Sequence, residues 1–548
     1  MTQASGGEVL VQALTAHDVD ALFGLPGLHT LAIYDALYEH PKIRTFVVRH
    51  EGSAAFMADG YARASGRPGV CLTIPGPGVA NTLAALGEAF GDSSPVLLIG
   101  GQIDTTKMGQ GKRAFHEFHN QSAMIEGVVG WRRLVKSPEE IPGAVAEAFQ
   151  AMTRSRQPVV LEIPMDVAGA RAEMLNLDMV PSSVSCPSIP NELVERAASL
   201  LRQAGSPFIL AGQGVLHASA TDTLVQLAEL MNAPVVTTEL GRSAFPEDHP
   251  LSVGYHWSHA MPFRSLLEQC DLLLAIGTDL GEKVGLGTLI PLAPSLMHLD
   301  VRKEVVGRHF PVVLGLVGDA GEVLPRIVRE LRDHRPTPKS DKRALLKMAR
   351  ASVARTLEKR GPFEYALVRT LRHTLPRNAI ISVDAAAVNN WLFHAYTVCE
   401  PRTFLSPSSA GTLGFALPAA LGAKVAYPER VAVAVVGDGG FLFTAQELAT
   451  ARKYGLNVIV LLFNDAEFGT IRYFQERDYR GRVIDTALCN PDFMDFSKSF
   501  GCEAVRVQDA ESLRDALLQA MEASRPTVIE IPIAVRYPAW VEKRAYDV

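Results

Sequence analysis

The chain has 548 residues, 47% of them hydrophobic and 20% charged, and a formal net charge of −6. This length exceeds what one hydrophobic core can hold, so we expect two to four domains. The mildly acidic balance gives no reason to expect a nucleic-acid or membrane partner. Six widely spaced cysteines without a CxxC pair, an N-terminus without a signal-peptide pattern, and no apolar run near the ~20 residues of a membrane helix favour a soluble, cytoplasmic protein.

The first segments of the chain alternate apolar runs, glycine turns and helical patterns. The apolar run at residues 46–48 stops at His50, and Glu51 then begins a helix of small residues. Glycine turns follow the patterns Phe-Gly-Leu-Pro-Gly at residues 23–27 and Gly-Pro-Gly at residues 76–78. Taken alone, Glu51 is equally compatible with a functional carboxyl group and with a glutamate that interacts with the helix dipole.

The sequence contains one internal repeat. Residues 141–167 and 512–535 each predict an amphipathic helix, a turn with arginine and proline, and a strand that ends in Ile-Pro. Two such units so far apart predict two domains of the same α/β design, one at each end of the chain.

Two linkers set off a third domain between these two. Residues 171–191 carry several prolines and serines, and residues 334–340 read HRPTPKS. Between them, apolar runs at residues 208–211 and 272–277 alternate with helical patterns. We therefore predict three α/β domains with doubly wound, mostly parallel sheets. Their expected bounds are residues 1–170, 190–333 and 355–548.

The segment at residues 431–464 carries the strongest chemical signal. Its pattern is a strand, a glycine-rich turn around Asp438, a helix, and a second strand that ends at Asn464. Ligands bind at the strand ends of open α/β sheets, glycines admit a phosphate close to the backbone, and Asp and Asn oxygens suit Mg²⁺. The pattern therefore predicts a site for a diphosphate and its metal, rather than a tight turn without a ligand.

This layout resembles the cofactor signature of thiamine-diphosphate enzymes, in which a GDG turn is followed at a fixed distance by Asn. Residues 404–418 resemble the segment that grips the aminopyrimidine ring in the acetolactate synthase-like branch, and Glu51 stands at the place of the cofactor-activating glutamate. The glycine turns of the first domain match as well, so the resemblance covers nearly the whole chain. It implies pyrimidine-binding, central and diphosphate-binding domains in that order, with thiamine diphosphate and Mg²⁺ as cofactors.

The resemblance also assigns roles to individual residues. Glu51 hydrogen-bonds the pyrimidine ring and so activates the cofactor, a task for which a carboxyl group in an apolar pocket is suited. Leu413 props the cofactor in its bent shape. The expected metal ligands are Asp438, Asn464 and the backbone carbonyl of Ala466. The remaining expected cofactor contacts are Gly27, Gly78, Asn389, Asn390, Gly411, Gly437, Gly439, Gly440 and Gly469. The two neighbouring asparagines are nearly as compatible with a polar loop pair.

The substrate-facing positions depart from better-defined relatives. His116 stands where acetolactate synthases have glutamine in an Ala-Phe-Gln-Glu segment, and its imidazole suits proton transfer at the reacting carbon. A loop histidine that caps a turn fits this position equally. His29 is a second catalytic candidate near the substrate entrance. His119 fits a turn better than catalysis, and Tyr473 and Phe474 either shape the pocket or belong to an interface.

The central domain does not resemble that of the FAD-containing acetolactate synthases. Residues 277–283 lack the Arg-Phe-Asp-Asp run of that type, and residues 254–256 also depart from its pattern. FAD is therefore doubtful, whereas ADP or coenzyme A stays open without a clear fingerprint for either.

Together these features predict an enzyme that cleaves or forms a carbon–carbon bond at a 2-oxo acid, with or without an aldehyde or ketone acceptor. A decarboxylase and an acetolactate synthase-like carboligase both fit. The alternatives are a 2-hydroxyacyl-CoA or benzoin-type lyase and, in a different class, a non-catalytic homologue. An NAD(P)-dependent oxidoreductase is disfavoured because no GxGxxG follows an early strand. In the family Glu51 and Asp438 meet across a subunit interface, so we expect at least a homodimer, with a homotetramer favoured.

Overall fold

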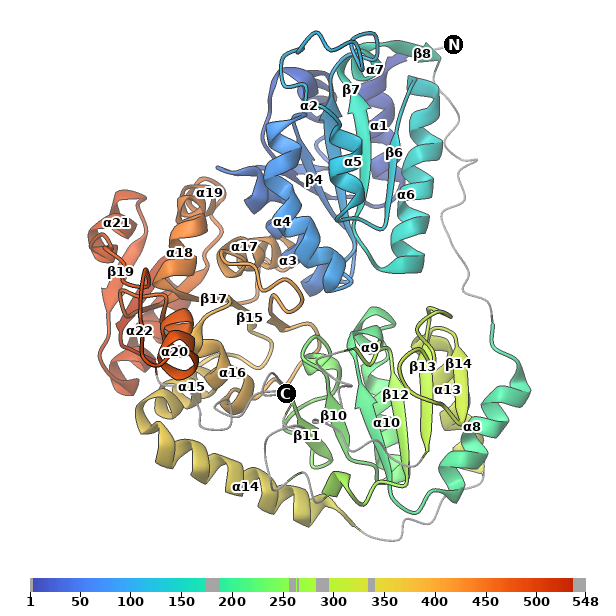
Figure 1. The fold of residues 1–548 in the computed structure, drawn as a ribbon, viewed down its shortest axis with the longest axis vertical. Helices are drawn as coiled ribbons and strands as arrows, with labels where there is room; N and C mark the ends of the chain where they lie inside the picture. The colour runs from blue at the N-terminus through green and yellow to red at the C-terminus, as the bar shows by residue number, and fades with distance from the viewer. Residues whose placement is uncertain are drawn as a thin grey trace.

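The structure is a computed structural model that describes residues 3–173, 188–255, 263, 266–281, 295–333 and 341–535. It contains three six-stranded sheets whose strands all run parallel, each flanked by helices, and one two-stranded antiparallel pair (Figure 1). The predicted class of three doubly wound α/β domains is confirmed. The strands read as continuous apolar runs because parallel sheets are covered on both faces.

The N-terminal domain is built on a sheet in the order β3-β2-β4-β5-β7-β6. Its strands are β2 (Ala21–Gly24), β3 (Arg44–Val47), β4 (Gly69–Thr73), β5 (Val96–Gln102), β6 (Trp131–Leu134) and β7 (Val159–Pro164). Its helices are α1 (Gly6–Ala16), α2 (Leu31–Glu39), α3 (Glu51–Ser65), α4 (Pro77–Gly91), α5 (Gln121–Glu126), α6 (Ile141–Ser155) and α7 (Met165–Gly169). The short strands β1 (Gln3–Ser5) and β8 (Arg171–Glu173) pair antiparallel, so this domain extends just past residue 170.

The C-terminal domain repeats this design with the order β16-β15-β17-β18-β20-β19. Its strands are β15 (Ile380–Val383), β16 (Phe404–Leu405), β17 (Ala432–Gly437), β18 (Ile459–Asn464), β19 (Glu503–Arg506) and β20 (Thr527–Pro532). Its helices are α15 (Pro362–Thr374), α16 (Ala387–Ala395), α17 (Ala416–Ala426), α18 (Asp438–Thr444), α19 (Leu448–Tyr454), α20 (Gly469–Asp478), α21 (Phe493–Ser499) and α22 (Ala510–Glu522), with a short 3₁₀ helix, η5 (Ala445–Glu447). Counted from its own first strand, each end domain has the same strand order, with β7 and β20 in equivalent places. The predicted duplication is confirmed.

The central domain has a different order, β11-β10-β9-β12-β13-β14. Its strands are β9 (Pro207–Ala211), β10 (Val235–Thr237), β11 (Ser252–Gly254), β12 (Leu272–Ile276), β13 (Leu296–Asp300) and β14 (Leu314–Val317). Its helices include α8 (Asn191–Gln203), α9 (Gln213–His217), α10 (Thr221–Met231) and α13 (Ala320–Asp333). This is the strand order of dinucleotide-binding sheets, with the chain reversing direction between β9 and β12.

A long helix, α14 (Arg343–Arg360), leads from the central to the C-terminal domain along the lower edge of Figure 1. The predicted linker at residues 334–340, most of the linker at 171–191, His256, residues 282–283 and the last part of the third predicted domain lie outside the described residues. Within the part of the chain that is described, no helix is both long and apolar enough to cross a membrane.

The N- and C-terminal domains pack directly on each other through α3 and α17 (Figure 1). One hydrophobic cluster contains side chains from both helices, including Phe56 and Phe415. Small residues permit this close approach, because a Cβ at Gly422 would lie 1.9 Å from the Met57 carbonyl oxygen. The packing fixes how the two duplicated domains of one chain are oriented.

Candidate active site

The predicted diphosphate and metal site lies at the carboxyl ends of two neighbouring parallel strands. β17 ends at Gly437, Asp438 begins α18, and Asn464 is the last residue of β18. Gly437 pairs with Phe463 in the register of the two strands, so these ends lie side by side. Asp438 is 1% exposed, and burial raises the pKa of its carboxyl group. A carboxyl group buried in this way requires a proton or a cation as partner.

The side chain of Asp438 contacts that of Asp465, a residue that was not predicted from the sequence. The two carboxyl groups share a hydrogen bond, and burial together with the Asp438 charge raises the pKa of Asp465 to about 7. Gly469 permits this placement, because a Cβ there would lie 2.7 Å from the Asp465 Oδ2. Two adjacent carboxyl groups favour a shared proton or a bound divalent cation. A signal was present in the sequence, since Asp465 directly follows the last strand residue.

The side chain of Asn464 is engaged by protein groups. Its Oδ1 accepts hydrogen bonds from the Asn490 Nδ2 at 3.1 Å and from the Ala466 backbone N–H at 3.2 Å. Its Nδ2 donates to the Glu530 Oε1 at 2.7 Å. The geometry therefore favours Asp465 over Asn464 as the group that faces a metal, while the assignment of Asn464 from the sequence stays a prediction.

Asn490 is a second residue that sequence reasoning missed. Its Nδ2 donates to the Asp438 Oδ2 at 2.6 Å as well as to Asn464. It lies after α20, far from both residues along the chain, and no local pattern marks it. The backbone carbonyl of Ala466, also predicted as a ligand, accepts a hydrogen bond from the Leu488 N–H at 2.7 Å.

The surroundings of the carboxyl pair fit a diphosphate with its metal. Among the described residues, no group of three or more His, Cys, Asp or Glu side chains could hold a metal alone. A cation at the pair therefore needs further oxygens, which a diphosphate supplies. Gly439 and Gly440 form the first turn of α18, and a Cβ at Gly440 would lie 3.2 Å from the Asp384 carboxyl carbon. The buried Oδ1 of Asn389 has no hydrogen-bond partner, whereas Asn390 bonds the backbone of its own helix.

The predicted pyrimidine-binding segment forms the loop between β16 and α17. Gly411 has φ +63°, a left-handed conformation that favours glycine, and no atom lies within 4 Å of where its Cβ would be. Leu413 is half-buried. The Gly414 N–H donates to the Asp384 Oδ2 at 3.0 Å, and burial raises the pKa of Asp384 to about 6. Gly411 is thus open to a ligand, while the end of the loop is fixed to the sheet.

Glu51 begins α3 and is half-buried in the single chain. Its Oε2 accepts a hydrogen bond from the Asn81 Nδ2 at 2.9 Å, and a Cβ at Gly78 would lie 3.6 Å from its Oε1. Gly78 therefore lies beside the carboxyl group, as expected for a residue of the same site. A Cβ at Gly27 would lie 2.3 Å from the Ile74 side chain, so the Pro-Gly turn packs on the residue two positions before the Gly-Pro-Gly segment.

The two candidate catalytic histidines lie together. The rings of His29 and His116 are stacked with their centroids 5.2 Å apart, and the Phe115 ring stacks on both. His29 is 6% exposed, and burial followed by the nearby His116 lowers its pKa. The buried Nδ1 atoms of both histidines have no hydrogen-bond partner. The His116 carbonyl oxygen lies 2.3 Å from where a Cβ of Gly76 would be, which places this pair at the turn that also borders Glu51.

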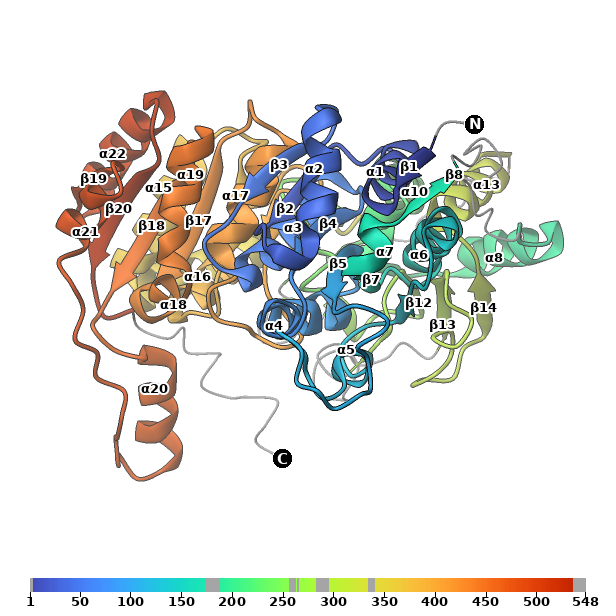
Figure 2. The same ribbon diagram turned by 90° about the horizontal axis from the view of Figure 1, so that it is seen from above.

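The other substrate-facing candidates lie elsewhere. His119 is exposed. Tyr473 and Phe474 are neighbours on α20, with ring centroids 5.5 Å apart, and α20 has no buried residue. In Figure 2 this helix projects away from the rest of the C-terminal domain.

A separate cavity of about 330 Å³ lies at the carboxyl ends of the central strands β9, β12 and β13. Its lining includes Arg156, Gly214, Gly277, Asp300 and Arg302. The close packing of Gly214 on Gly277 places both turns at the point where the strand order reverses, a usual position for a nucleotide. The doubt about FAD, and the open choice of ADP or coenzyme A, stay predictions from the sequence.

Fold and site together define the class of protein. The two α/β domains of the same design each carry one group of candidate residues: the C-terminal domain has a carboxyl pair suited to a metal with phosphate oxygens, and the N-terminal domain has a glutamate near a histidine pair. Both groups are compatible with an enzyme that works through a diphosphate-bearing cofactor.

Comparisons with known proteins identify the family. The descriptions of the matching family models are thiamine pyrophosphate enzyme N-terminal binding domain at residues 4–124, central domain at 194–327 and C-terminal binding domain at 384–531. The chain is 33% identical to a probable acetolactate synthase large subunit of Methanocaldococcus jannaschii, with 96% of this chain and 92% of that protein covered. It is 34% identical to a probable 2-ketoarginine decarboxylase of Pseudomonas aeruginosa, covering 96% and 94%, and 34% identical to an acetolactate synthase large subunit of Corynebacterium glutamicum, covering 98% and 88%. The chain belongs to the thiamine pyrophosphate enzyme family, and it is a cofactor-dependent enzyme of the 2-oxo acid decarboxylase and carboligase type.

Proposed function

We propose that this enzyme is a 2-oxo acid decarboxylase that uses thiamine diphosphate and Mg²⁺ and releases an aldehyde. The observation that carries the choice of decarboxylase is the stacked pair His29 and His116 next to the turn that borders Glu51. After CO2 leaves, a decarboxylase must deliver a proton to the reacting carbon, whereas a carboligase must keep protons away from it until an acceptor arrives. A pair of imidazoles with free ring nitrogens suits proton delivery.

The chain's own groups would hold the cofactor at both ends. Bound thiamine diphosphate supplies a carbon nucleophile and accepts the electrons of the departing carboxylate. Glu51 hydrogen-bonds the pyrimidine nitrogen, Gly411 and Leu413 contact the same ring, and Asn81 keeps the Glu51 carboxyl group in place. These roles follow from the family resemblance and from the placement of each group.

Asp438 and Asp465 would bind the Mg²⁺ that neutralises the diphosphate. Asn490 donates hydrogen bonds to Asp438 and to Asn464. These bonds would orient the Asp438 carboxyl group for metal binding. A Cβ at Gly439 would lie 2.6 Å from the Phe468 ring and one at Gly440 3.2 Å from the Asp384 carboxyl carbon, so both positions favour glycine, and their backbone N–H groups would contact phosphate oxygens.

His29 or His116 would deliver the proton to the reacting carbon. Because burial lowers the pKa of His29, its imidazole is neutral near pH 7, with one nitrogen that donates and one that accepts. The rings of His29 and His116 are stacked with their centroids 5.2 Å apart, so each imidazole would act as a separate proton donor, without a hydrogen bond between the two.

The active unit we propose is a homodimer or a tetramer of two dimers. Both ends of the site carry large apolar side chains that are exposed in the single chain, as an interface requires. Near His29 and His116 these are Leu28, Leu31, Phe115 and Phe118, and on α18, α20 and the following loop they are Leu442, Phe443, Ile471 and Ile484. If the apolar group near His29 of one chain packs on the apolar group of α18 and α20 of another chain, and the reverse, two equivalent sites are completed. A cytoplasmic location stays a prediction from cysteine spacing.

Product analysis tests the proposed reaction. The purified protein is incubated with thiamine diphosphate, Mg²⁺ and a panel of 2-oxo acids that includes pyruvate and the guanidino acid 2-ketoarginine. CO2 with free aldehyde is the expected result. CO2 with acetolactate or another 2-hydroxy ketone would establish a carboligase instead, and no CO2 from any acid would favour a lyase acting on acyl-CoA or acyloin substrates.

A further inference from the structure

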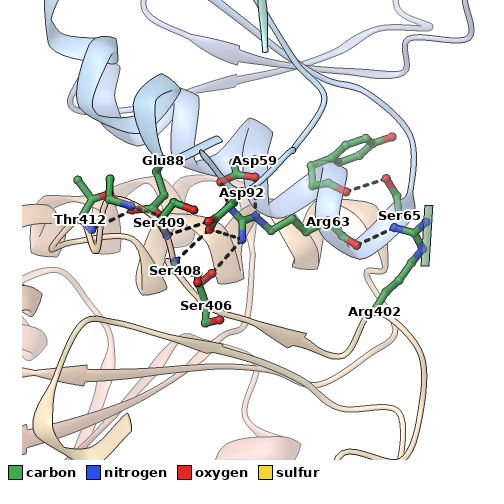
Figure 3. A network of polar contacts seen from close by, with 12 residues as sticks. Asp59, Arg63, Ser65, Glu88, Asp92, Arg402, Ser406, Ser408, Ser409 and Thr412 are labelled. Atoms are coloured by element: carbon green, nitrogen blue, oxygen red, sulfur yellow. Dashed lines mark hydrogen bonds and ion pairs between the residues drawn. The ribbon is translucent and has the colours of Figure 1, made fainter. Parts of the chain in front are cut away.

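The cofactor-facing loop is held from the N-terminal domain of the same chain. Residues 406–412 lie between the two domains, at the C-terminal end of α4 (Figure 3). The Ser408 N–H donates to the Asp92 Oδ2 at 3.0 Å and the Ser409 N–H to the Asp92 Oδ1 at 2.8 Å. The Ser406 carbonyl accepts a hydrogen bond from the Arg63 Nη1 at 2.9 Å. The loop backbone is therefore anchored to α3 and α4 at its start.

Glu88 binds the part of the loop that flanks Gly411. Its Oε1 accepts from the N–H groups of Ser409 at 3.1 Å and Ala410 at 3.3 Å, and its Oε2 accepts from the Thr412 N–H at 2.9 Å and from the Thr412 hydroxyl group. All four partners are donors, so an ionised carboxylate satisfies them in full. Glu88 is 0% exposed. One buried side chain thus fixes the backbone on both sides of the open glycine.

The loop donors offset the negative charge of this cluster: burial and Asp92 raise the pKa of Glu88, and the hydrogen bonds from Thr412 lower it. Asp59, Asp92 and Glu88 lie around one guanidinium group, that of Arg63, which bonds Asp59 at 2.7 Å and Asp92 at 3.1 Å. Three buried carboxyl groups against one cation leave negative charge that burial disfavours. The loop N–H groups supply the remaining stabilisation. The cluster and the ordered loop therefore stabilise each other.

Steric contact adds to the hydrogen bonds. A Cβ at Gly91, the last residue of α4, would lie 2.3 Å from the Ser409 Cβ. The end of α4 therefore packs on the loop without space for a methyl group. On the other side, Asp384 holds the Gly414 N–H, so Gly411 and Leu413 lie between two fixed points.

We propose that Glu88 is a positioning residue for catalysis: it clamps the loop at residues 409–412 so that Gly411 and Leu413 are presented to the pyrimidine ring in one conformation. The inference rests on the proposed cofactor site, but neither Glu88 nor Gly91 needs to touch the cofactor. Pre-formed loop geometry lowers the ordering cost of binding.

The variant Glu88→Gln tests the clamp. In glutamine an NH2 group replaces one of the two accepting oxygens. In either orientation of the amide, this NH2 group therefore faces two loop groups that are themselves donors. We expect the dissociation constant of thiamine diphosphate at saturating Mg²⁺ to rise about tenfold or more. We also expect faster hydrogen exchange of the amides of Ser409, Ala410 and Thr412. Gly91→Ala, which displaces the same loop without a change of charge, should shift both readouts in the same direction.

Glu247→Gln is the matched control. The Glu247 side chain is 9% exposed and accepts the Val398 N–H at 2.7 Å across a different domain boundary, so it controls for the loss of a near-buried carboxylate. If Glu88→Gln does not fold, Thr412→Val removes only the hydroxyl donor and Thr412→Ser restores it. Wild-type affinity together with unchanged loop exchange in Glu88→Gln would overturn the proposal. Failure of the wild-type protein to bind thiamine diphosphate would refute the cofactor site instead, because the exchange measurement reports the clamp independently.

Discussion

At the residue scale, the site depends on carboxyl groups whose neighbours decide their chemistry. Burial raises the pKa of Asp438, and burial together with the Asp438 charge raises the pKa of Asp465 to about 7, so a divalent cation would relieve the repulsion between the two carboxyl groups. Glu51 has a different setting, held by Asn81 at the start of α3. The same functional group therefore serves a metal at one end of the site and a heterocycle at the other.

Replacing Glu51 by glutamine tests its role in activating the cofactor. Glutamine keeps the size and the hydrogen bond to Asn81 but cannot share a proton with the ring. Turnover should fall about a hundredfold or more while thiamine diphosphate still binds. Steady-state rates and calorimetric binding measure the two quantities separately, and near-normal turnover would contradict the assignment.

The choice of metal ligand can be decided by comparing neighbouring positions. We expect Asp465→Ala and Asp438→Ala to weaken Mg²⁺-dependent retention of the cofactor about a hundredfold, and Asn464→Ala about tenfold, because the Asn464 oxygen already accepts two protein hydrogen bonds. Retention after gel filtration at graded Mg²⁺ concentrations measures the ranking. The reverse ranking would support the ligand set predicted from the sequence.

At the scale of elements, the contact of α3 with α17 holds the two duplicated domains together. A Cβ at Gly60 would lie 2.1 Å from the Ala419 carbonyl oxygen, and one at Gly422 would lie 1.9 Å from that of Met57. Backbone approaches backbone here, so no side-chain rotation can make room. The same two helices begin or end near the site, which makes their spacing a condition for its geometry.

Gly422→Ala should therefore destabilise the protein although alanine is the better helix former. Overpacking at a buried helix contact costs about 1–3 kcal/mol. Thermal unfolding should show a lowered midpoint. Gly143→Ala in α6 is the control, because no atom lies within 4 Å of its Cβ position, and we expect a gain of up to about 1 kcal/mol there. Equal behaviour of the two variants would contradict the close packing of α3 and α17.

At the scale of the whole molecule, the loop at residues 406–412 is a meeting point of all three domains. Glu88 of α4 and the adjoining Asp92 bind its backbone, and Asp384 binds the N–H of Gly414 just after it. Ser408 and Ser409 also line the cavity of the central domain. Glu51 and Asp438, by contrast, lie on different domains, with exposed apolar side chains near each; in the proposed function a second copy of the chain would cover them.

Mixing two inactive variants tests this assembly. In a dimer with shared sites, a Glu51→Gln chain and an Asp438→Ala chain combine both defects in one site and leave the other intact. Random exchange of subunits should therefore restore about a quarter of wild-type activity. Activity measured after co-expression or after denaturation and refolding of the mixture gives the result, and no recovery beyond the separate variants would show that each chain builds its own site.

Local signals in the sequence, namely apolar runs, glycine turns and helix starts, were enough to predict the three α/β domains, the duplication and the elements that carry Glu51 and Asp438. It did not distinguish Asp465 from Asn464, since successive residues at a strand end point in opposite directions and only the neighbouring chain shows which one faces the site. Asn490, the pairing of His29 with His116, and the hold of Glu88 on its loop likewise needed the tertiary structure. Each of these joins segments that are distant along the chain, and their contacts are set by how sheets and domains pack, which no local pattern records.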